Sequence, residues 1–252
     1  MVRLGQNFLA DPNLLDAIVR DAELEPDDVV LEVGAGEGVL TERLAAAAAR
    51  VHTVEIDRGL EAALRRVSGL PNVELHWGDA MKFELAALDP APSAMVANLP
   101  YAVATPLILR TIERLPSLRR WTVMVQREIA DRLRAGPGSR TYGGPSVLVQ
   151  LACEVELVRR VDPAVFRPRP RVDSAILRLR RTGPAADPAT RDLVRAAFAH
   201  RRKSLARSLE HGAAGSLGAA RAALAELGLP EDARAEALAP HQFAALSAKL
   251  RG

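Results

Sequence analysis

The chain has 252 residues, of which 48% are hydrophobic and 26% charged, and its formal net charge is +3. This composition is typical of a globular protein with a sizeable core, and because no apolar run approaches the ~20 residues of a membrane-spanning helix we expect no membrane partner and a cytoplasmic location. Its single cysteine, Cys153, excludes an internal disulfide framework and a cysteine-rich metal site, so we expect no metal.

The first predicted elements are a short polar and aromatic segment, Gly5–Leu9, and the helix that follows it. Asp11 is a residue type that caps helices, and Pro12 suits the first helical position. Leu14, Ile18 and the apolar residues beside them then recur with helical spacing. We therefore expect an amphipathic helix that packs on the main body of the protein.

A glycine loop follows the first predicted strand, Val29–Val33, and leads into a helical pattern from Val39. Strand, glycine loop and helix form the first unit of a doubly wound sheet, in which Gly34 and Gly36 let the backbone approach a ligand. The spacing is Gly-x-Gly-x-Gly, whereas a dinucleotide fingerprint requires Gly-x-Gly-x-x-Gly. A nicotinamide oxidoreductase is therefore disfavoured.

The next three predicted strands all end in a polar side chain. Val51–Glu55 ends in an acid about 20 residues after the first glycine, where a carboxylate can accept hydrogen bonds from both ribose hydroxyls. Asn72–Trp77 is followed by Asp79, and the strand beginning at Ser93 ends in Asn98. Each acid could instead cap the following helix. Because all four predicted strands end in glycine or a polar side chain, we favour one shared ligand site at the carboxyl ends of the strands of a parallel sheet.

The fourth strand end presents an amide, a carbonyl group and an aromatic ring in succession. Asn-x-Pro is also a common turn. In the context of the rim, however, the Asn98 oxygen and the Leu99 carbonyl can each accept one hydrogen of an adenine amine, while Pro100 stiffens the turn. Tyr101 can stack on the base, and Phe166 is a candidate for the opposite face. The rim thus predicts methyl transfer from S-adenosylmethionine to an exocyclic adenine nitrogen, with no strong base required.

The rest of the chain completes the sheet and then becomes helical. Further strands are predicted at Trp121–Val125, Glu154–Val161 and Ser174–Leu179, with an exposed, mobile loop at Ala135–Pro145. We expect an α/β fold whose Rossmann-like sheet is mostly parallel and has seven strands. The predicted domains are residues 1–182, which bind the cofactor, and residues 183–252, a small all-helical domain that contributes to RNA binding.

The charge is distributed unevenly along the chain. Between Arg167 and Arg207 there are twelve basic and three acidic residues, so this segment carries +9 and the remainder carries −6. Such clustering predicts a polyanionic partner, although a solvated linker would also account for the alternating Pro and Arg from Phe166 to Arg171. The candidate phosphate contacts are Arg134, Arg140, Arg167, Arg169, Arg201, Arg202 and Lys203.

Taken together, the motifs resemble those of the ribosomal RNA adenine dimethyltransferases, in order and over nearly the whole chain. The matching segments are Gly5–Leu9, Glu32–Thr41, Val54–Asp57, Gly78–Ala80, Asn98–Tyr101 and Phe166–Ser174. Two further segments, Ala135–Gly143 and Phe198–Leu205, are most similar to the small-subunit, kasugamycin-sensitivity branch of the family. Macrolide-resistance enzymes, which act on the large subunit, share the core and are the alternative.

The resemblance implies a class I methyltransferase fold and dimethylation of two adjacent adenosines in the 3′-terminal hairpin of small-subunit rRNA, on an incompletely assembled subunit. It implies a cofactor site over which the N-terminal segment closes. The candidate cofactor contacts are Gln6, Asn7, Leu9, Gly34, Gly36, Glu55, Ile56, Asp79, Ala80 and Asn98. We expect a monomer. A hypothesis of another class is a ribosome-assembly checkpoint that acts mainly by binding.

Overall fold

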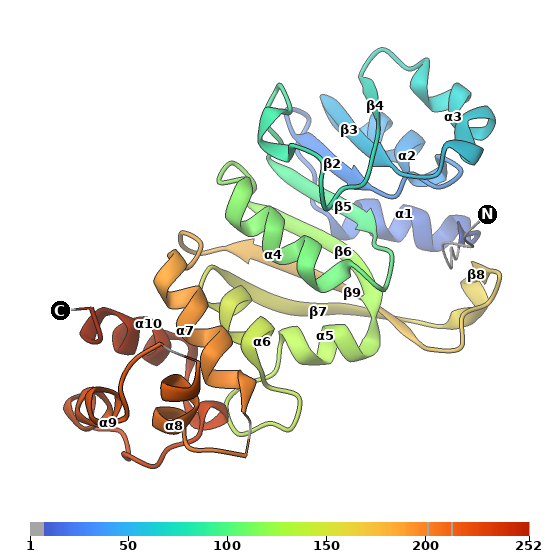
Figure 1. The fold of residues 1–252 in the computed structure, drawn as a ribbon. Helices are drawn as coiled ribbons and strands as arrows, with labels where there is room; N and C mark the ends of the chain where they lie inside the picture. Colours follow the sequence, from blue (N-terminus) through green and yellow to red (C-terminus); the bar gives the residue numbers. More distant parts are fainter. Residues whose placement is uncertain (1–7, 201, 213, 252) are drawn as a thin grey trace. The chain divides into compact units, whose positions relative to one another are not determined.

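The computed structural model describes residues 8–200, 202–212 and 214–251 (Figure 1). The chain forms two compact units, Met1–Ala130 with Val155–Arg181, and Asp131–Glu154 with Thr182–Gly252. The sequence pattern predicts a boundary at residue 182, which would put residues 131–154 in the first domain. In the structure these residues belong to the helical unit, because Tyr142 and Val147 lie in its hydrophobic core.

The first unit is built on a seven-stranded sheet with the order β4-β3-β2-β5-β6-β9-β7, whose strands are labelled in Figure 1. The pairs from β4 to β6 are parallel, whereas β6 and β9 are antiparallel. The predicted mostly parallel, seven-stranded sheet is confirmed. The strand bounds are β2 Val29–Val33, β3 Arg50–Glu55, β4 Val73–Trp77, β5 Ala94–Asn98, β6 Arg120–Gln126, β7 Cys153–Val161 and β9 Ser174–Arg181.

Helices and short 3-10 turns connect these strands. Their bounds are α1 Pro12–Asp21, α2 Val39–Ala47, η1 Arg58–Leu60, α3 Glu61–Ser68, η2 Leu85–Ala87, α4 Ala104–Arg114, α5 Arg127–Leu133 and η3 Pro163–Val165. The predicted cap of α1 is present, since the Asp11 carboxylate accepts a hydrogen bond from Leu14 N at 2.9 Å. None of the helices in the described part of the chain is long and apolar enough to cross a membrane.

Alternate residues of the central strands pack against α1 and α2. Val30, Val51 and Val96 share one core with Ile18 of α1 and Leu44 of α2, all nearly inaccessible to solvent. Strands buried on both faces read as continuous apolar runs, which is why β2 and β5 were recognisable in the sequence. The same packing holds the carboxyl ends of β2 to β5 together at one rim.

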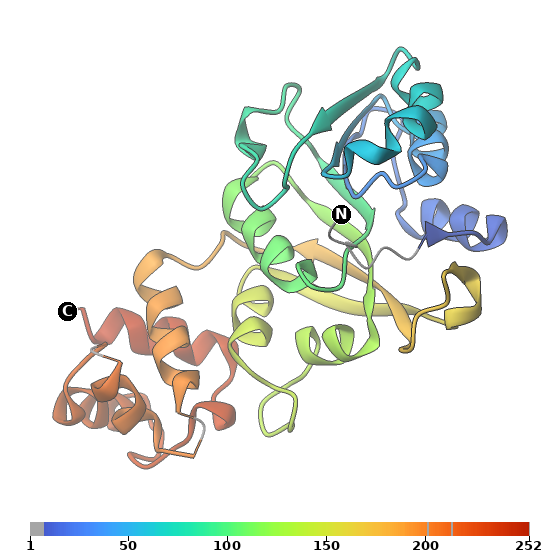
Figure 2. The ribbon, with the colours of Figure 1, turned by 45° about the vertical axis from the view of Figure 1, so that its right-hand side comes forward.

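A separate two-stranded sheet joins the beginning of the chain to the Pro/Arg segment. β1, Phe8–Leu9, pairs antiparallel with β8, Phe166–Arg167, so that Leu9 lies opposite Phe166 (Figure 2). Ala10 N extends the pairing by donating to Val165 O at 3.0 Å. The sequence predicted an extended loop here, and the structure instead begins it with a short strand.

The second unit is all-helical. It contains α6 Gly144–Gln150, α7 Pro188–Ala199, α8 Leu205–His211, α9 Leu217–Glu226, η4 Ala235–Ala237 and α10 Pro240–Lys249. The loop at Ala135–Pro145 was expected to be exposed and mobile, but its Tyr142 is fully buried and donates to Leu238 O at 2.8 Å. Burial raises the pKa of the Tyr142 hydroxyl above its usual range. The loop is therefore anchored in the core, although Arg140 on it is exposed.

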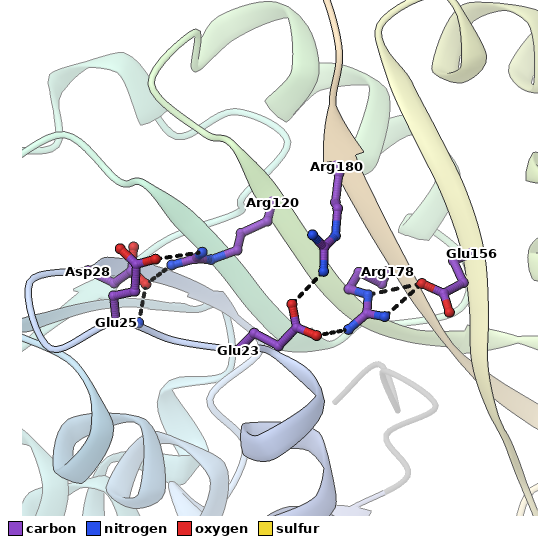
Figure 3. Close-up of polar contacts among 7 residues, drawn as sticks. All are labelled: Glu23, Glu25, Asp28, Arg120, Glu156, Arg178 and Arg180. Carbon is purple, nitrogen blue, oxygen red and sulfur yellow. Dashed lines mark hydrogen bonds and ion pairs between the residues drawn. The ribbon is translucent and has the colours of Figure 1, made fainter.

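Two groups of ion pairs tie β6 and β9 to the segment between α1 and β2 (Figure 3). Glu23 lies between Arg178 and Arg180 of β9 and accepts from both guanidinium groups at 2.5 Å. Beside them, Arg120 of β6 pairs with the carboxylate of Asp28, which is only 1% exposed. Arg178 and Arg180 thus have structural partners, so the basic segment presents less free charge than its sequence suggests.

The Asp28 carboxylate accepts hydrogen bonds from three groups. Besides Arg120, it accepts the Ser93 hydroxyl at 2.6 Å and Glu25 N at 2.7 Å. Burial by itself raises the pKa of Asp28, but the hydrogen bonds from Ser93, Glu25 and Arg120 outweigh it and hold the pKa below its usual 3.8. The ionised form of Asp28 is therefore favoured by folding.

Replacement of Asp28 by alanine should lower the free energy of unfolding by roughly 3 kcal/mol at pH 7, because Arg120 loses its buried partner. The difference from the wild type should shrink as the pH falls below 3.8 through the folded pKa, where the wild-type carboxylate also becomes neutral. Urea unfolding at several pH values measures both. Asp16→Ala, which breaks the exposed pair with Arg43, is the control and should cost less than about 1 kcal/mol. Equal losses in both variants would contradict the assignment.

Candidate functional site

A cavity of about 430 Å³ lies at the carboxyl ends of β2, β3, β4 and β5. Its wall includes Gly34, Glu55, Asp79 and Asn98, each of which ends or follows one of these strands. The four strand ends that the sequence grouped thus surround one space within the first unit. Leu9, Gly36, Ile56 and Ala80, also expected at the cofactor site, line the same cavity. The other two predicted cofactor contacts, Gln6 and Asn7, lie outside the described residues.

The loop after β2 requires glycine for its backbone shape. Gly34, Gly36 and Gly38 have φ values of +83°, +56° and +78°, a region that other residues rarely adopt. A Cβ atom on Gly38 would also lie 2.9 Å from Val67 Cγ2. Gly34 N donates to Val54 O at 2.8 Å, which holds the start of the loop against β3. The loop is therefore pressed close to the neighbouring strand end.

The Glu55 carboxylate organises the adjoining backbone. Its Oε2 accepts Gly36 N at 3.0 Å, and its Oε1 accepts the N–H groups of Ile56 and Asp57 at 2.8 Å each. The side chain is 4% exposed and lies on the cavity wall. Because an ionised carboxylate offers about four acceptor positions, it can hold the loop and still accept from a ligand hydroxyl.

The next part of the wall suits a flat ring. Ile56 is 51% exposed although it lines the cavity, so an apolar ligand face would cover it. Asp79 caps its own turn, since its Oδ1 accepts Met81 N at 2.9 Å. The capping alternative considered for this acid is thus present, and the remaining acceptor capacity of the carboxylate is available for a ring amine.

The segment after β5 forms the other wall. Leu99 N donates to Met124 O at 3.0 Å, which fixes the turn against β6, and a Cβ atom on Gly34 would lie 3.7 Å from both Asn98 O and Pro100 Cδ. Asn98, Leu99, Pro100 and Tyr101 all line the cavity. The expected catalytic segment and the glycine loop are therefore in near contact across the site.

Ser174 supports Tyr101 in a way that the sequence analysis did not foresee. The two hydroxyl groups hydrogen-bond at 2.7 Å, and Ser174, the first residue of β9, is fully buried. β9 is held in turn by its antiparallel register with β6, in which Ser174 lies opposite Gln126. The ring of Tyr101 is thus oriented from a strand 73 residues later in the chain.

Phe166, the candidate for the opposite face of the base, is buried in the core of the first unit. Its side chain is 2% exposed and packs in the core with Leu9 and Ile176, because β8 turns it inward on pairing with β1. The expectation that it forms the second face of a base site stays a prediction, and in this structure the ring is covered by core residues. The aromatic ring that β1 brings to the cavity is Phe8, which lies 3.3 Å from the position of a Cβ atom on Gly36.

Glu32 is a second residue that sequence reasoning missed. It is 1% exposed in β2, lines the cavity, and accepts the Thr41 hydroxyl at 2.6 Å through Oε2. Its other oxygen is buried without a hydrogen-bond partner among the described residues. Burial raises the pKa of Glu32 to about 7, although the nearby Thr41 and Thr53 hydroxyl groups favour the ionised form. The available signal was an acid inside an otherwise apolar strand.

These features fit S-adenosylmethionine. An orphaned buried carboxylate oxygen calls for a cationic partner, which the ammonium or sulfonium group of this cofactor would supply. Glu55 would hold its ribose, and Ile56 with Asp79 would hold its adenine, as the sequence predicts; all three line the cavity. The chemistry that the cofactor brings when bound is an electrophilic methyl group.

The candidate RNA contacts are exposed but belong to both units. Arg167 and Arg169 lie in the first unit, and Arg169 is 3.6 Å from the Asp162 carboxylate. Lys203 in the helical unit donates to His211 Nε2 at 2.7 Å. Arg134, Arg140 and Arg202 are exposed in the helical unit, whereas Arg201 lies outside the part of the chain that the structure describes.

Comparison with known proteins gives concordant matches. The family model described as ribosomal RNA adenine dimethylase matches residues 2–251. The "Ribosomal RNA small subunit methyltransferase A" of Rubrobacter xylanophilus is 48% identical, with 97% of this chain and 92% of that protein covered. The protein of the same name from Streptomyces griseus is also 48% identical, over 96% and 87% of the two chains.

Solved structures agree with the fold. A dimethyladenosine transferase from Plasmodium falciparum superposes with a TM-score of 0.81 at 27% identity, covering 95% of each chain. The 23S rRNA methyltransferase ErmE gives a TM-score of 0.71 at 32% identity, covering 98% of this chain and all of ErmE.

Glu32 should make stability fall with rising pH. Because its folded pKa of about 7 lies above the usual 4.5, the protonated form is favoured by folding, and this contribution is present below pH 4.5 and lost as the pH rises through 7. As the pH rises from 4.5 to 8, the free energy of unfolding of Glu32→Gln should therefore increase by roughly 3 kcal/mol relative to that of the wild type. Urea unfolding without cofactor measures this. Glu37→Gln on the exposed part of the same loop should show no such gain, and a wild-type-like pH profile for Glu32→Gln would exclude the raised pKa.

Proposed function

Because this chain belongs to the ribosomal RNA adenine dimethylase family, we propose that it dimethylates the exocyclic amines of two adjacent adenosines in the 3′-terminal hairpin of small-subunit rRNA. Members of this family use S-adenosylmethionine. The observation that carries the proposal is that the glycine loop, Glu55 and Asn98–Tyr101 line one and the same cavity. Small-subunit specificity is supported by the 48% identity to two small-subunit methyltransferases, against 32% to ErmE.

The residues after β5 act by position and electrostatics. The Asn98 side-chain oxygen and the Leu99 carbonyl each accept one hydrogen of the adenine amine, which turns the nitrogen lone pair out of the ring plane toward the cofactor side of the cavity. This replaces a strong base, because the amine becomes acidic only after it has been alkylated and then loses its proton to water. The Leu99–Met124 hydrogen bond keeps the accepting groups in place before the substrate arrives.

Tyr101 supplies the stacking surface for the base. A base in a hairpin reaches such a site only when it leaves its own stack, and an aromatic face offsets part of that cost, by about 1–3 kcal/mol. Ser174 holds the Tyr101 hydroxyl, so the ring is oriented in advance.

We assign cofactor binding and catalysis to the first unit and part of the RNA contact to exposed cations of both units, with Arg134, Arg140, Arg202 and Lys203 on the helical one. Counterion release from the rRNA backbone would supply much of the affinity. We further propose that the protein acts as a monomer in the cytoplasm, on a pre-assembled small subunit. A subunit presents the hairpin in a defined shape, which suits an enzyme with few candidate base contacts.

Two alternatives remain distinct from this proposal. The similarity to ErmE supports large-subunit methylation as a second activity to test. A checkpoint that acts mainly by binding differs from both, because Glu55→Ala would then abolish methylation and leave subunit binding intact.

The deciding experiment incubates the protein and labelled S-adenosylmethionine with unmethylated small or large subunits and maps the modified nucleotides by mass spectrometry. We expect label on two adjacent adenosines of the small subunit alone. Asn98→Ala should reduce transfer on the order of 10²–10³-fold with a modest loss of cofactor affinity, since it removes an acceptor that acts on the amine. Label in the large subunit would favour the ErmE-like activity, and subunit binding without any label would favour the checkpoint.

Ser174→Ala and Tyr101→Phe should each lower the turnover number about fivefold, because each removes the hydrogen bond that orients the ring. The double variant should lose no more than either single variant, since both changes break the same contact. Cofactor affinity measured by calorimetry should not change. Ser146→Ala, at a buried serine of the helical unit, controls for general effects of removing a buried hydroxyl. Additive losses would show that Ser174 does not act through Tyr101.

A further inference from the structure

Two histidines and a glutamate form a cluster on the edge of the sheet, on strands β3 and β4. His52 lies opposite Glu74 in the parallel register, and His76 follows two residues later. Their side chains share the face of the sheet opposite α1 and α2, because Val51 and Val73, with the alternate orientation, pack in the core with those helices. This cluster has no local signal in the sequence, because His52 is brought to Glu74 and His76 only by strand pairing.

The three groups have the spacing of ligands around one small cation. His52 Nδ1 is 3.2 Å from His76 Nε2 and 3.6 Å from Glu74 Oε2, and His76 Nε2 is 3.8 Å from Glu74 Oε1. Ligands at about 2.0–2.1 Å from a tetrahedral zinc ion are separated by about 3.3 Å. Among the residues that the structure describes, this group has ligand atoms of all three side chains within 4.8 Å of one another.

The protonation of His52 suits a metal ligand. Its Nε2 lies 3.0 Å from the carbonyl oxygen of Pro90, which can only accept, so the ring proton is on Nε2 and the Nδ1 lone pair faces His76 and Glu74. Metal-binding histidines are commonly held in this way by a backbone carbonyl on the other ring nitrogen. The Phe83 ring, 5.3 Å from the His76 ring between centroids, limits the movement of the second imidazole.

The exposure of the three side chains leaves one side open to solvent. His52 is fully buried, His76 is 17% exposed and Glu74 is 42% exposed. A cation at the centre can therefore keep a water molecule as a further ligand. The competing group is Arg50, whose guanidinium contacts Glu74 Oε2 at 2.6 Å. Because both partners are about a third or more exposed, this ion pair is weak and can be exchanged.

We propose that His52, Glu74 and His76 bind one divalent transition-metal ion, with zinc as the type ion. Imidazole and carboxylate ligands suit zinc, copper and nickel. On binding, Glu74 exchanges Arg50 for the metal, and the His76 ring carries its proton on Nδ1 so that Nε2 coordinates. The ion has no part in methyl transfer. It cross-links the edge strand β4, after which the Asp79 turn begins, to the inner strand β3.

The contacts also have a metal-free description, in which His76 Nε2 donates to His52 Nδ1 and Glu74 pairs only with Arg50. The two descriptions differ in the effect of Arg50. In the metal-free case Arg50 only supports the cluster, whereas in the metal-binding case it is a competitor whose removal tightens binding.

The test titrates ZnCl₂ into full-length, tag-free protein stripped with a chelator, by calorimetry, and records the visible spectrum with Co²⁺. We expect one equivalent to bind with micromolar affinity, a Co²⁺ spectrum of low coordination number, and a Tm raised by about 5 °C at saturation. His76→Gln, at a partly exposed position, should abolish all three, and Glu74→Gln should weaken binding at least tenfold. Arg50→Gln should bind several-fold more tightly than the wild type.

His211→Gln is the matched control, because His211 has a second histidine, His200, at a similar ring distance of 5.5 Å in the helical unit. It should bind zinc as the wild type does. Absence of stoichiometric binding in the wild type would overturn the proposal. Binding that survives His76→Gln, or that disappears in His211→Gln, would do the same, as would weaker binding by Arg50→Gln.

Discussion

The cavity depends first on one carboxylate. Glu55 gathers three backbone N–H groups, one from the glycine loop after β2 and two from the turn after β3, and so sets the separation of two strand ends. Buried N–H groups without acceptors are costly, and the positive φ angles of the loop leave it few other ways to satisfy them. An acid at this position therefore shapes the binding surface before any ligand contacts it.

Much of the rim could be predicted because the end of each of its strands is marked in the sequence by glycine or a polar residue. β2 and β5 are short, mainly apolar runs, β3 and β4 alternate apolar and polar residues, and all four end at or just before glycine, Glu, Asp or Asn; parallel strands place those ends together. Glu32 escaped notice because an acid within such a run reads as part of the strand. Ser174 and Phe166 could not be placed, since their neighbours Tyr101 and Leu9 are far away in the sequence and only strand pairing brings them near.

The clustering of basic residues predicted the RNA-binding surface less directly than the strand pattern predicted the cavity. In the sequence every arginine of the segment from Arg167 counts equally, but the structure separates Arg178 and Arg180 of β9, which pair with Glu23 and Glu156, from the arginines of the exposed Pro/Arg segment. Arg178 and Arg180 stabilise the fold by holding the segment that leads into β2 (Figure 3). A phosphate backbone therefore meets fewer cations than the sequence contains, and these lie in both units.

The pairing of β1 with β8 has a consequence for how the protein is made. Phe8 lines the cavity and is held by a strand whose first residue, Phe166, follows Leu9 by 157 residues. Translation proceeds from the N-terminus, so β2 to β6 can assemble while β1 still has no strand to pair with, and the closure of so long a loop is a late step. A nascent chain can thus form the parallel part of its sheet, β2 to β6, before it acquires the wall contributed by Phe8, which has to wait for the synthesis of β8.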